Sequence, residues 1–246
     1  ICNKHAVRTY IIPDYFKFLA RKFRISLIGN FPIITVRNEP LEELHFQFIK
    51  RLFDIVFSLL VIVCIVSWLF PIIIVLQKIL SPGPIFYSQY RIGKGNSVFT
   101  CFKFRSMTPA PIEREFKATT TDDPRITKFG KFLRKSNIDE LPQIFNVLLG
   151  DMSIVGPRPH AVSYNEKYAE FIEELRLRNL VKPGITGWAQ IHGLRGDVTN
   201  EEENKARILK RFEFDIWYVE NWSFSLDIQI IFLTFWEIIR GRAKGV

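Results

Sequence analysis

The sequence has few of the residues that build disulfide frameworks and zinc sites. Its three cysteines, Cys2, Cys64 and Cys101, stand far apart with no CxxC pair, and its four histidines show no metal-ligand spacing. Neither a disulfide-stapled fold nor a structural zinc site is expected, and this cysteine usage fits a reducing, cytosol-facing location. The 246 residues also contain no internal repeat and no low-complexity tract.

The opening stretch from Ile1 lacks the features of a secretory signal, namely a basic start, a short apolar run and a small-residue cleavage site. We therefore expect a fragment whose natural N-terminus is missing. Residues 1–45 carry short apolar stretches broken by proline and by Asn30. This pattern favours the closing strands and helix of a separate, truncated domain.

The composition is that of a folded protein that favours both polyanions and apolar surroundings. Apolar types make up 48 % of the residues and charged types 24 %, which excludes a disordered tail. Lys and Arg number 34 against 25 Asp and Glu, so the net charge is +9, and 23 residues are Phe. A basic protein binds polyanions such as nucleic acid, anionic lipid head groups or phosphorylated substrates, whereas many Phe residues favour apolar surroundings.

One long apolar run divides the chain. No charged residue occurs from Ile55 to Gln77, and at ~1.5 Å per residue this run is long enough to cross a ~30 Å hydrocarbon layer. Pro71 lies inside the run and predicts a sharp kink near Phe70. Basic residues flank both ends of the run: Lys50, Arg51, Lys78, Arg91 and Lys94.

Positive flanks favour the cytoplasmic side of a membrane, here at both ends of the run. We therefore expect residues 46–80 to form a re-entrant helix that dips into one leaflet and returns, with Ser67 bonding backbone groups freed by Pro71. An ordinary transmembrane helix kinked at Pro71 and a buried core helix are the alternatives.

Residues 81–246 predict an α+β, mostly helical domain. Alternating apolar residues on both sides of Gly93–Asn96 predict a small β-hairpin. A polar loop around Thr119–Pro124 follows, which would suit a lid, and a helical pattern dominates from Ile126 onward.

An aromatic-rich helix is expected near the C-terminus. It contains Asp227 and Glu237 and is therefore a poor membrane-spanning segment. We expect an amphipathic helix in the membrane interface, and a core helix of the soluble part is the alternative. The aromatic residues expected to face lipid or core are Trp222, Phe232, Phe235 and Trp236.

Asp139 and Glu140 are the candidates for chemistry. They follow a short helix that Thr127 is placed to cap, with Phe129, Phe132 and Leu133 on its inner face. We expect Asp139 to be the N-cap of a second helix, which has Pro142 in its first turn and ends at Gly150. An Asp followed by a Glu is also a common helix start, so a purely structural role stays open.

Adjacent carboxylates at a positive helix end, ringed by Arg and Lys, suit phosphoryl chemistry. One carboxylate can attack phosphorus to form an acyl phosphate, and its neighbour can hold a Mg²⁺ ion that bridges phosphate oxygens. Four cations are candidates for binding phosphate: Lys103 and Arg105 on one strand, Arg134, and Arg158, which lies between two prolines.

A glycine-containing loop, KPGITGWAQ, is a further candidate. Gly184 and Gly187 would let its backbone approach a ligand, and Trp188 offers a stacking face. A surface loop with one anchoring aromatic residue is the alternative.

Four segments resemble the consecutive motifs of the bacterial sugar transferase family, the monotopic polyprenyl-phosphate phosphoglycosyl transferases. They are KRLFDIVFSLL, SPGPIFYSQYRIGKGNSVFTCFKFRSM, TKFGKFLRKSNIDELPQIFNVLLGDMSIVGPRPH and KPGITGWAQIHGLRG. The C-terminal part resembles the subgroup of undecaprenyl-phosphate glucose phosphotransferases of exopolysaccharide synthesis. In that subgroup four transmembrane helices and a Rossmann-like domain precede the catalytic part, so residues 1–45 would be the end of that region.

The resemblance implies roles for individual residues. Asp139 would be the nucleophile and Glu140 its partner, and both Glu140 and Asp139 would bind Mg²⁺. Phosphate and nucleotide binding would fall to Lys103, Arg105, Arg134 and Arg158. The subgroup often has Asn where this chain has His192.

We therefore expect an enzyme at the cytoplasmic face of the bacterial inner membrane. It would transfer a sugar 1-phosphate, glucose 1-phosphate by resemblance, from a UDP-sugar to undecaprenyl phosphate, with loss of UMP. The alternatives are UDP-galactose as donor, a glycosyltransferase that releases UDP, and a non-catalytic membrane assembly module. The lipid bilayer is an expected partner, a homodimer is left open, and nucleic acid is not expected because the aromatic residues do not interleave with the basic patches.

Overall fold

The computed structural model describes residues 24–29, 31–35, 37–108, 123–163, 173–196, 198 and 200–240. The chain divides into two compact units, Ile1–Glu39 and Pro40–Val246. In the first unit, β1 (Arg24–Ile28) and β2 (Phe31–Thr35) form an antiparallel hairpin in which Ile28 pairs with Phe31. The helix expected within residues 1–45 lies outside the described residues of this unit.

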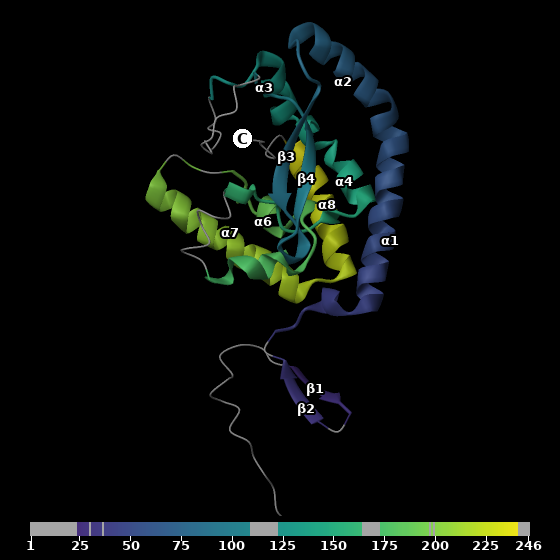
Figure 1. Ribbon diagram of the computed structural model, residues 1–246, viewed down its shortest axis with the longest axis vertical. Coiled ribbons are helices and arrows are strands. Elements are labelled where there is room, and N and C mark those ends of the chain that lie inside the picture. Colours follow the sequence, from purple (N-terminus) through teal and green to yellow (C-terminus); the bar gives the residue numbers. More distant parts are fainter. Residues whose placement is uncertain are drawn as a thin grey trace, which may run out of the picture. The chain divides into compact units, whose positions relative to one another are not determined.

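A long apolar helix begins the second unit. It consists of α1 (Leu44–Val61), a π-helical segment (Ile62–Val66) and α2 (Ser67–Leu80). These 37 residues are long and apolar enough to cross a membrane, and 17 % of the most apolar window is buried. Figure 1 shows α1 and α2 as one curved helix along a single side of this unit.

The long helix is curved, but it lacks the sharp kink that Pro71 was predicted to cause near Phe70. Pro71 lies inside α2 with helical residues on both sides, and the bend is spread over many residues instead of forming a sharp kink near Phe70 (Figure 1). Two backbone carbonyls of the π-helical segment accept hydrogen bonds from side chains. Ser67 Oγ donates to the Val63 carbonyl at 2.7 Å and Trp68 Nε1 donates to the Cys64 carbonyl at 2.8 Å. The Ser67 hydroxyl therefore bonds a carbonyl of the π-helical segment before it and not a backbone group freed by Pro71.

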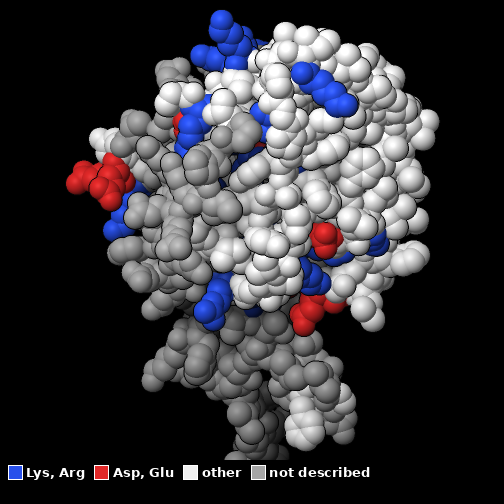
Figure 2. Space-filling model, turned by 45° about the horizontal axis from the view of Figure 1, so that its top comes forward, with Lys and Arg blue, Asp and Glu red and all other residues white. Residues whose placement is uncertain are grey.

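The outer face of α1 and α2 is apolar and exposed. The large exposed side chains include Leu52, Val56, Leu60, Val63, Trp68, Ile72, Val75 and Ile79. Figure 2 shows few Lys, Arg, Asp or Glu side chains on the right-hand side, where α1 and α2 lie. An apolar surface of this length is typical of a segment that contacts lipid or another protein.

The predicted β-hairpin is confirmed. β3 (Phe86–Ile92) pairs antiparallel with β4 (Val98–Phe104), from Phe86 opposite Phe104 to Ile92 opposite Val98. A 3-10 turn at Lys94–Asn96 connects them, and Gly95 adopts a φ of 65°, which favours glycine. Residues 119–122 of the polar loop expected after the hairpin lie outside the described residues.

The rest of the unit is mostly helical, as expected for an α+β fold. Its elements are α3 (Lys128–Lys135), a 3-10 turn (Ile138–Glu140), α4 (Gln143–Leu149), β5 (Ser153–Val155), a 3-10 helix (Glu173–Leu180), β6 (Gly184–Thr186), α6 (Trp188–Ile191), α7 (Glu201–Asn221) and α8 (Phe224–Ile239). β5 and β6 are parallel.

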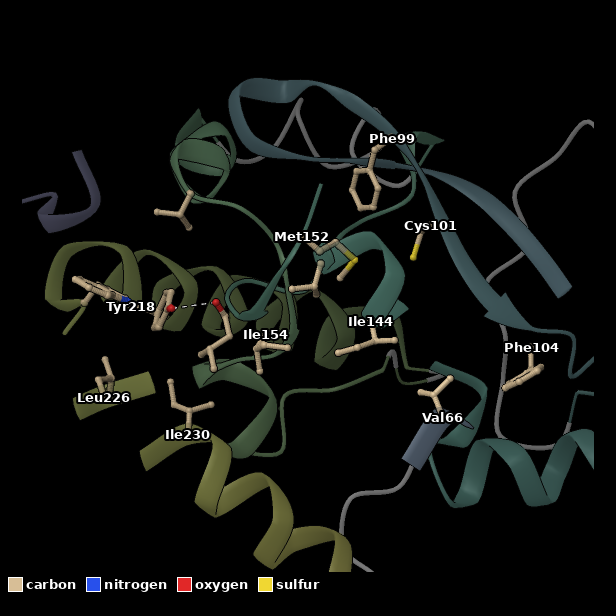
Figure 3. Close-up of a cluster of buried hydrophobic side chains, with 14 of the residues drawn as sticks. Val66, Phe99, Cys101, Phe104, Ile144, Met152, Ile154, Tyr218, Leu226 and Ile230 are labelled. Carbon is tan, nitrogen blue, oxygen red and sulfur yellow. Dashed lines mark hydrogen bonds between the residues drawn. The ribbon is translucent and has the colours of Figure 1, made fainter. Parts of the chain in front are cut away.

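One hydrophobic core joins these elements. Figure 3 shows Tyr218, Leu226 and Ile230 at one end, Val66 and Phe104 at the other, and Met152, Ile154 and Ile144 between them. Thr127 caps α3 as predicted, because its Oγ accepts the Gly130 N–H at 2.9 Å. Phe129 and Leu133 face this core, but Phe132 is 53 % exposed, so its predicted inward orientation is wrong.

Both ends of the long helix are anchored in the same unit by buried polar side chains. Lys50 forms an ion pair with Asp227 of α8 at 2.6 Å and donates to the Val155 carbonyl at 3.0 Å. At the other end Gln77 Nε2 donates to the carbonyls of Ile85 and Arg105, both at 3.0 Å. The helix therefore starts and finishes against one folded body.

The C-terminal helix α8 has two different faces. Leu226, Asp227 and Ile230 are buried. Its outward residues are apolar and exposed: Phe224, Ile228, Phe232, Phe235, Trp236 and Ile239. Of the four aromatic residues expected to face lipid or core, Trp222 lies just before the helix and is buried in the core.

Candidate active site

Asp139 and Glu140 lie in the 3-10 turn Ile138–Glu140, which follows the left-handed residue Asn137 (φ 57°). α4 begins later, at Gln143, with Pro142 as its N-cap, so the prediction that Asp139 caps this helix is wrong. Gly150 ends α4 as predicted, with a φ of 97°. Asp139 is 8 % exposed and Glu140 is 5 % exposed, which is unusual for carboxylates without cationic partners.

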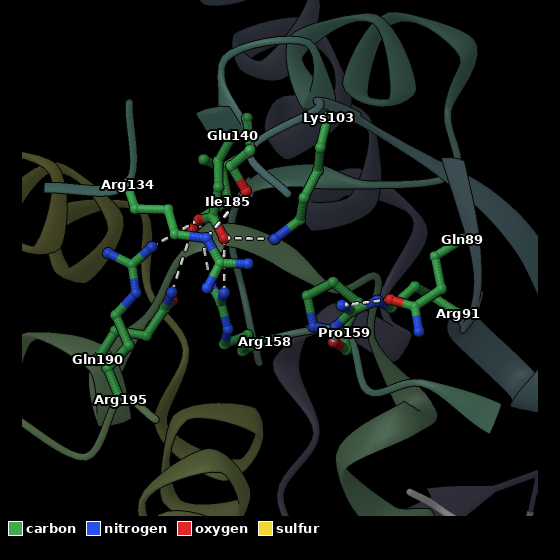
Figure 4. A network of polar contacts seen from close by, with 11 residues as sticks. Gln89, Arg91, Lys103, Arg134, Glu140, Arg158, Pro159, Ile185, Gln190 and Arg195 are labelled. Carbon is green, nitrogen blue, oxygen red and sulfur yellow. Dashed lines mark hydrogen bonds and ion pairs between the residues drawn. The ribbon is translucent and has the colours of Figure 1, made fainter. Parts of the chain in front are cut away.

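Three cations converge on the Glu140 carboxylate (Figure 4). Lys103 Nζ lies 2.7 Å from Oε1, and Arg195 Nη2 lies 2.7 Å from Oε2. The Arg158 guanidinium bridges both oxygens, at 2.6 Å to Oε1 and 3.1 Å to Oε2. Charge-assisted bonds of this length, with one bidentate arginine, hold the three cations around one point.

The pKa values of the two adjacent carboxyl groups are shifted in opposite directions. Burial raises the pKa of Glu140, but Arg158, Lys103 and Arg195 outweigh burial and hold its pKa well below the usual value. Burial and then the Glu140 carboxylate raise the pKa of Asp139. One carboxylate is therefore held by cations, and its neighbour is a buried group with a more basic oxygen.

Arg134 stands beside this cluster (Figure 4). Its Nε donates to Ser106 Oγ at 2.9 Å. α3 carries it, and α3 approaches the end of β4 closely, since a Cβ on Gly130 would lie 1.9 Å from the Ser106 carbonyl oxygen. Glycine at this position therefore brings Arg134 within reach of the site.

Arg105 does not join the cluster. Its guanidinium donates to the backbone carbonyls of Ser81, Pro84 and Met107. The side chain is 6 % exposed, so it closes the turn after α2 instead of presenting a free cation to a phosphate. Of the four cations proposed from the sequence, Lys103 and Arg158 contact Glu140 and Arg134 lies next to it.

A buried network supports the turn that carries Arg158. Arg178 is 3 % exposed, forms an ion pair with Asp215 of α7 at 2.9 Å, and donates to the Arg158 carbonyl. It also contacts the buried ring of His160 at 2.7 Å. Burial, followed by the charge of Arg178, holds the pKa of His160 well below its usual value, so this ring is neutral near pH 7.

Arg195 was not identified from the sequence as a separate candidate. It lies within the motif KPGITGWAQIHGLRG, but its partner Glu140 is 55 residues away, and no local pattern marks that contact. Its position on Glu140 makes it the third cation of the cluster.

The KPGITGWAQ loop has a packing role in the structure. A Cβ on Gly184 would lie 2.1 Å from the Gly156 nitrogen, and a Cβ on Gly187 would lie 2.2 Å from the Gly156 carbonyl oxygen. These glycines therefore let two backbone segments meet. Trp188, expected to offer a stacking face, stacks one face of its ring on Trp217, with ring centroids 4.8 Å apart.

A divalent metal at this site would depend on few protein ligands. Among the residues that the structure describes, no group of three His, Cys, Asp or Glu side chains could hold a metal ion. Mg²⁺ commonly uses one or two carboxylates together with substrate phosphates, so Asp139 and Glu140 are sufficient in number. The three cations on Glu140 would compete with the ion for its oxygens.

The comparisons with known proteins agree with these features. The family model described as bacterial sugar transferase matches residues 45–241. The chain belongs to this family. The match includes the long apolar helix, the carboxylate pair and all three cations on Glu140.

Three relatives illustrate the similarity. A UDP-glucose:undecaprenyl-phosphate glucose-1-phosphate transferase of Escherichia coli (strain K12) is 42 % identical over 95 % of this chain and 49 % of its own length. A protein of the same name from Klebsiella pneumoniae is 44 % identical over 91 % of this chain and 47 % of its own length. An uncharacterized sugar transferase of Bacillus subtilis (strain 168) is 46 % identical over 78 % of this chain and 87 % of its own length. The chain thus spans about half the length of the first two relatives.

Proposed function

We propose that this chain carries the catalytic site of a phosphoglycosyl transferase that moves glucose 1-phosphate from UDP-glucose to undecaprenyl phosphate. This reaction would be the first membrane step of exopolysaccharide or capsule synthesis. The observation that carries the proposal is the buried pair Asp139 and Glu140 within a cluster of cations, in a unit that also presents a long apolar helix. The names of the Escherichia coli and Klebsiella relatives support the choice of donor and acceptor.

Two displacements at phosphorus account for the transfer. An Asp139 carboxylate oxygen attacks the β-phosphorus of the donor, the bond to the bridging oxygen breaks, and UMP leaves with that oxygen. A phosphate oxygen of undecaprenyl phosphate then attacks the same phosphorus. The bond to Asp139 breaks, the carboxylate is restored, and a diphosphate-linked lipid sugar is released.

The described contacts suit these steps. The raised pKa of Asp139 indicates a carboxylate poorly stabilised by its surroundings, and such an oxygen is the better nucleophile of the pair. The cations around Glu140 are preorganised beside it and would stabilise the charge that develops on phosphate oxygens. Asp139 and Glu140 would also hold Mg²⁺ when substrate phosphate draws cations away from Glu140, and the ion would supply further neutralisation of the diphosphate.

The long helix supports a re-entrant arrangement at the cytoplasmic face of the inner membrane. Lys50 and Gln77, near its two ends, are both buried against the same folded unit. A helix that crossed the bilayer would place these ends on opposite sides. With both ends anchored on one side, the exposed apolar residues between them would enter one leaflet, and the apolar face of α8 would lie in the interface.

The first test is an assay of the purified protein with UDP-sugars, undecaprenyl phosphate and Mg²⁺. We expect UMP as the nucleotide product and faster turnover of UDP-glucose than of UDP-galactose. Release of UDP would show a transfer of the sugar alone and contradict the proposal. Faster turnover of UDP-galactose would keep the reaction and change the donor.

The nucleophile is tested with Asp139→Asn, and Asp151→Asn serves as a matched control beyond α4. We expect the first variant to lose turnover and the second to retain it. After donor is added without acceptor, mass spectrometry of the wild-type protein should find a phosphosugar on the peptide containing Asp139. Normal turnover by Asp139→Asn would leave a non-catalytic assembly role as the better explanation of this carboxylate pair.

The membrane arrangement is tested with Gln47→Cys and Lys78→Cys, introduced singly into a variant without native cysteines. A thiol reagent that cannot cross the membrane should label neither position in intact cells and both in inverted vesicles. Labelling of the two positions from opposite sides would show a transmembrane helix instead.

A further inference from the structure

The backbone segment around Arg195 is held from one side by α7. We call residues Gly193–Gly196 the Arg195 segment. Arg211 of α7 is 5 % exposed, and its Nε donates to the Leu194 carbonyl at 2.8 Å. The Nη2 group of the same side chain donates to the Gly196 carbonyl.

Arg207 binds the two remaining carbonyls of the Arg195 segment. Its Nη2 group donates to the Gly193 carbonyl and, at 3.0 Å, to the carbonyl of Arg195 itself. All four consecutive carbonyls of the segment therefore accept hydrogen bonds from two arginines. These arginines are four residues apart on α7 and so project from the same face of the helix.

The two glycines of the segment give its backbone more conformational freedom than other residues would, so hydrogen bonds from outside restrict it. Gly193 and Gly196, at its two ends, adopt φ values of 73° and 76°, where the chain is held in a turn that glycine accepts without steric cost. Between them, the Arg195 side chain reaches Glu140 at 2.7 Å. The backbone of the segment is thus fixed on one side by α7, and its one charged side chain is fixed on the other side by the carboxylate.

Arginine suits this task better than lysine. A guanidinium is a planar group with five N–H donors, so one side chain can bind two carbonyls in fixed directions. A lysine ammonium is a compact charge on a flexible stem and does not impose such directions. Loss of either arginine would leave carbonyls to water and free the Arg195 guanidinium to move away from the site.

We infer that Arg207 and Arg211 are positioning residues, which hold the Arg195 segment so that Arg195 stays on Glu140 during phosphosugar transfer. The kinetic part of this inference, the effect on phosphosugar transfer, rests on the proposed function. The structural part, that the two arginines hold the Arg195 segment, does not. Among the described residues, Arg207 and Arg211 bond the carbonyls of the Arg195 segment and not Glu140, so both would act through Arg195.

The structural part is tested by hydrogen–deuterium exchange in the full chain. We expect Arg207→Ala to raise exchange at least about tenfold in peptides that cover the Arg195 segment, because local opening sets these rates. Arg207→Lys should do so to a smaller extent. Lys210→Ala is the matched control, since it removes one exposed positive charge from the same helix and should leave this exchange unchanged.

The kinetic part is tested by a double-mutant cycle with Arg195→Ala. We expect Arg207→Ala to lower kcat/KM by about tenfold, the scale of one lost charge-assisted contact. In the Arg195→Ala background the same change should have no further effect, because an effect transmitted through Arg195 disappears with that side chain. Thermal unfolding of each variant separates this coupling from a general loss of stability.

The outcomes are distinct. Faster exchange together with non-additive kinetics supports the inference. Unchanged exchange in Arg207→Ala, or an equal loss of kcat/KM with and without the Arg195 side chain, overturns it. If the wild-type protein shows no transfer with any UDP-sugar, the proposed function fails, and the exchange experiment alone then supports or overturns the role of α7.

Discussion

Removing the charge of Asp227 should destabilise the protein strongly. Asp227 lies at the start of α8 and its side chain is 1 % exposed. It accepts from Lys50 Nζ at 2.6 Å, from the Tyr218 hydroxyl at 2.7 Å and from Trp222 Nε1 at 3.1 Å. In Asp227→Asn the shape of the side chain is retained, but the Lys50 ammonium, 8 % exposed, remains buried without its ion-pair partner.

The size of the effect follows from this burial. Breaking a buried ion pair by removing one partner costs about 3–5 kcal/mol, because the remaining charge is uncompensated. For a unit of this size each kcal/mol corresponds to roughly 2–4 °C in Tm. We therefore expect thermal unfolding of Asp227→Asn in detergent or lipid discs to begin roughly 6–20 °C below that of the wild type.

Two further variants complete the experiment. Glu237→Gln on the same helix is the matched control and should leave Tm within about 2 °C. The double variant Lys50→Met/Asp227→Asn removes both charges. The amide oxygen can keep the Trp222 bond made by Oδ2, and Tyr218, which bonds Oδ1, can still donate to the Val155 carbonyl, so the variant should recover part of the loss. If Asp227→Asn melts within about 2 °C of the wild type, the ion pair does not anchor α1 and the reasoning is wrong.

Three other changes have defined outcomes. Gly130→Ala places a Cβ 1.9 Å from the Ser106 carbonyl oxygen and should cost about 3 kcal/mol or more, against about 1 kcal/mol for Gly95→Ala, as measured by thermal unfolding. Burial and the Glu140 carboxylate raise the pKa of Asp139 above 3.8, so the acid limb of the kcat–pH profile should move to lower pH in Glu140→Gln; an unchanged limb would contradict this. Arg105→Ala should lower Tm while KM for the UDP-sugar stays within about twofold, and a large rise in KM would restore Arg105 as a phosphate ligand.

Local features of the structure were predictable from local sequence. The turn at Gly93–Asn96 predicts the hairpin, and Thr127 predicts the start of α3, because each depends on residues that are neighbours in the chain. The start of α4 was misplaced by a few residues. Asn137 takes a left-handed conformation and leads into a 3-10 turn, and no feature of the residues from Asn137 to Pro142 separates this turn from a helix that begins at Asp139.

Tertiary contacts explain what the sequence did not predict. Lys50 and Asp227 are interpreted from sequence as a flanking charge and as a residue that disfavours a membrane span, yet they are partners across 177 residues. Arg195 and Glu140 are likewise 55 residues apart in the chain, and tertiary folding brings them into contact. Arg105 alternates with Lys103 as expected for one strand face, but β4 ends at Phe104, and the chain beyond it turns the Arg105 side chain toward the carbonyls near Ser81.

The separation of Lys50 from Asp227 also sets an order of assembly. Lys50 and Asp227 are 177 positions apart, so at ~5–20 residues per second a ribosome needs on the order of ten to thirty seconds to reach the second partner after the first. The apolar helix therefore leaves the ribosome well before its anchor on α8 exists. During that interval the charge of Lys50 lacks its partner Asp227, so this side chain reaches its buried position only after α8 has been synthesised.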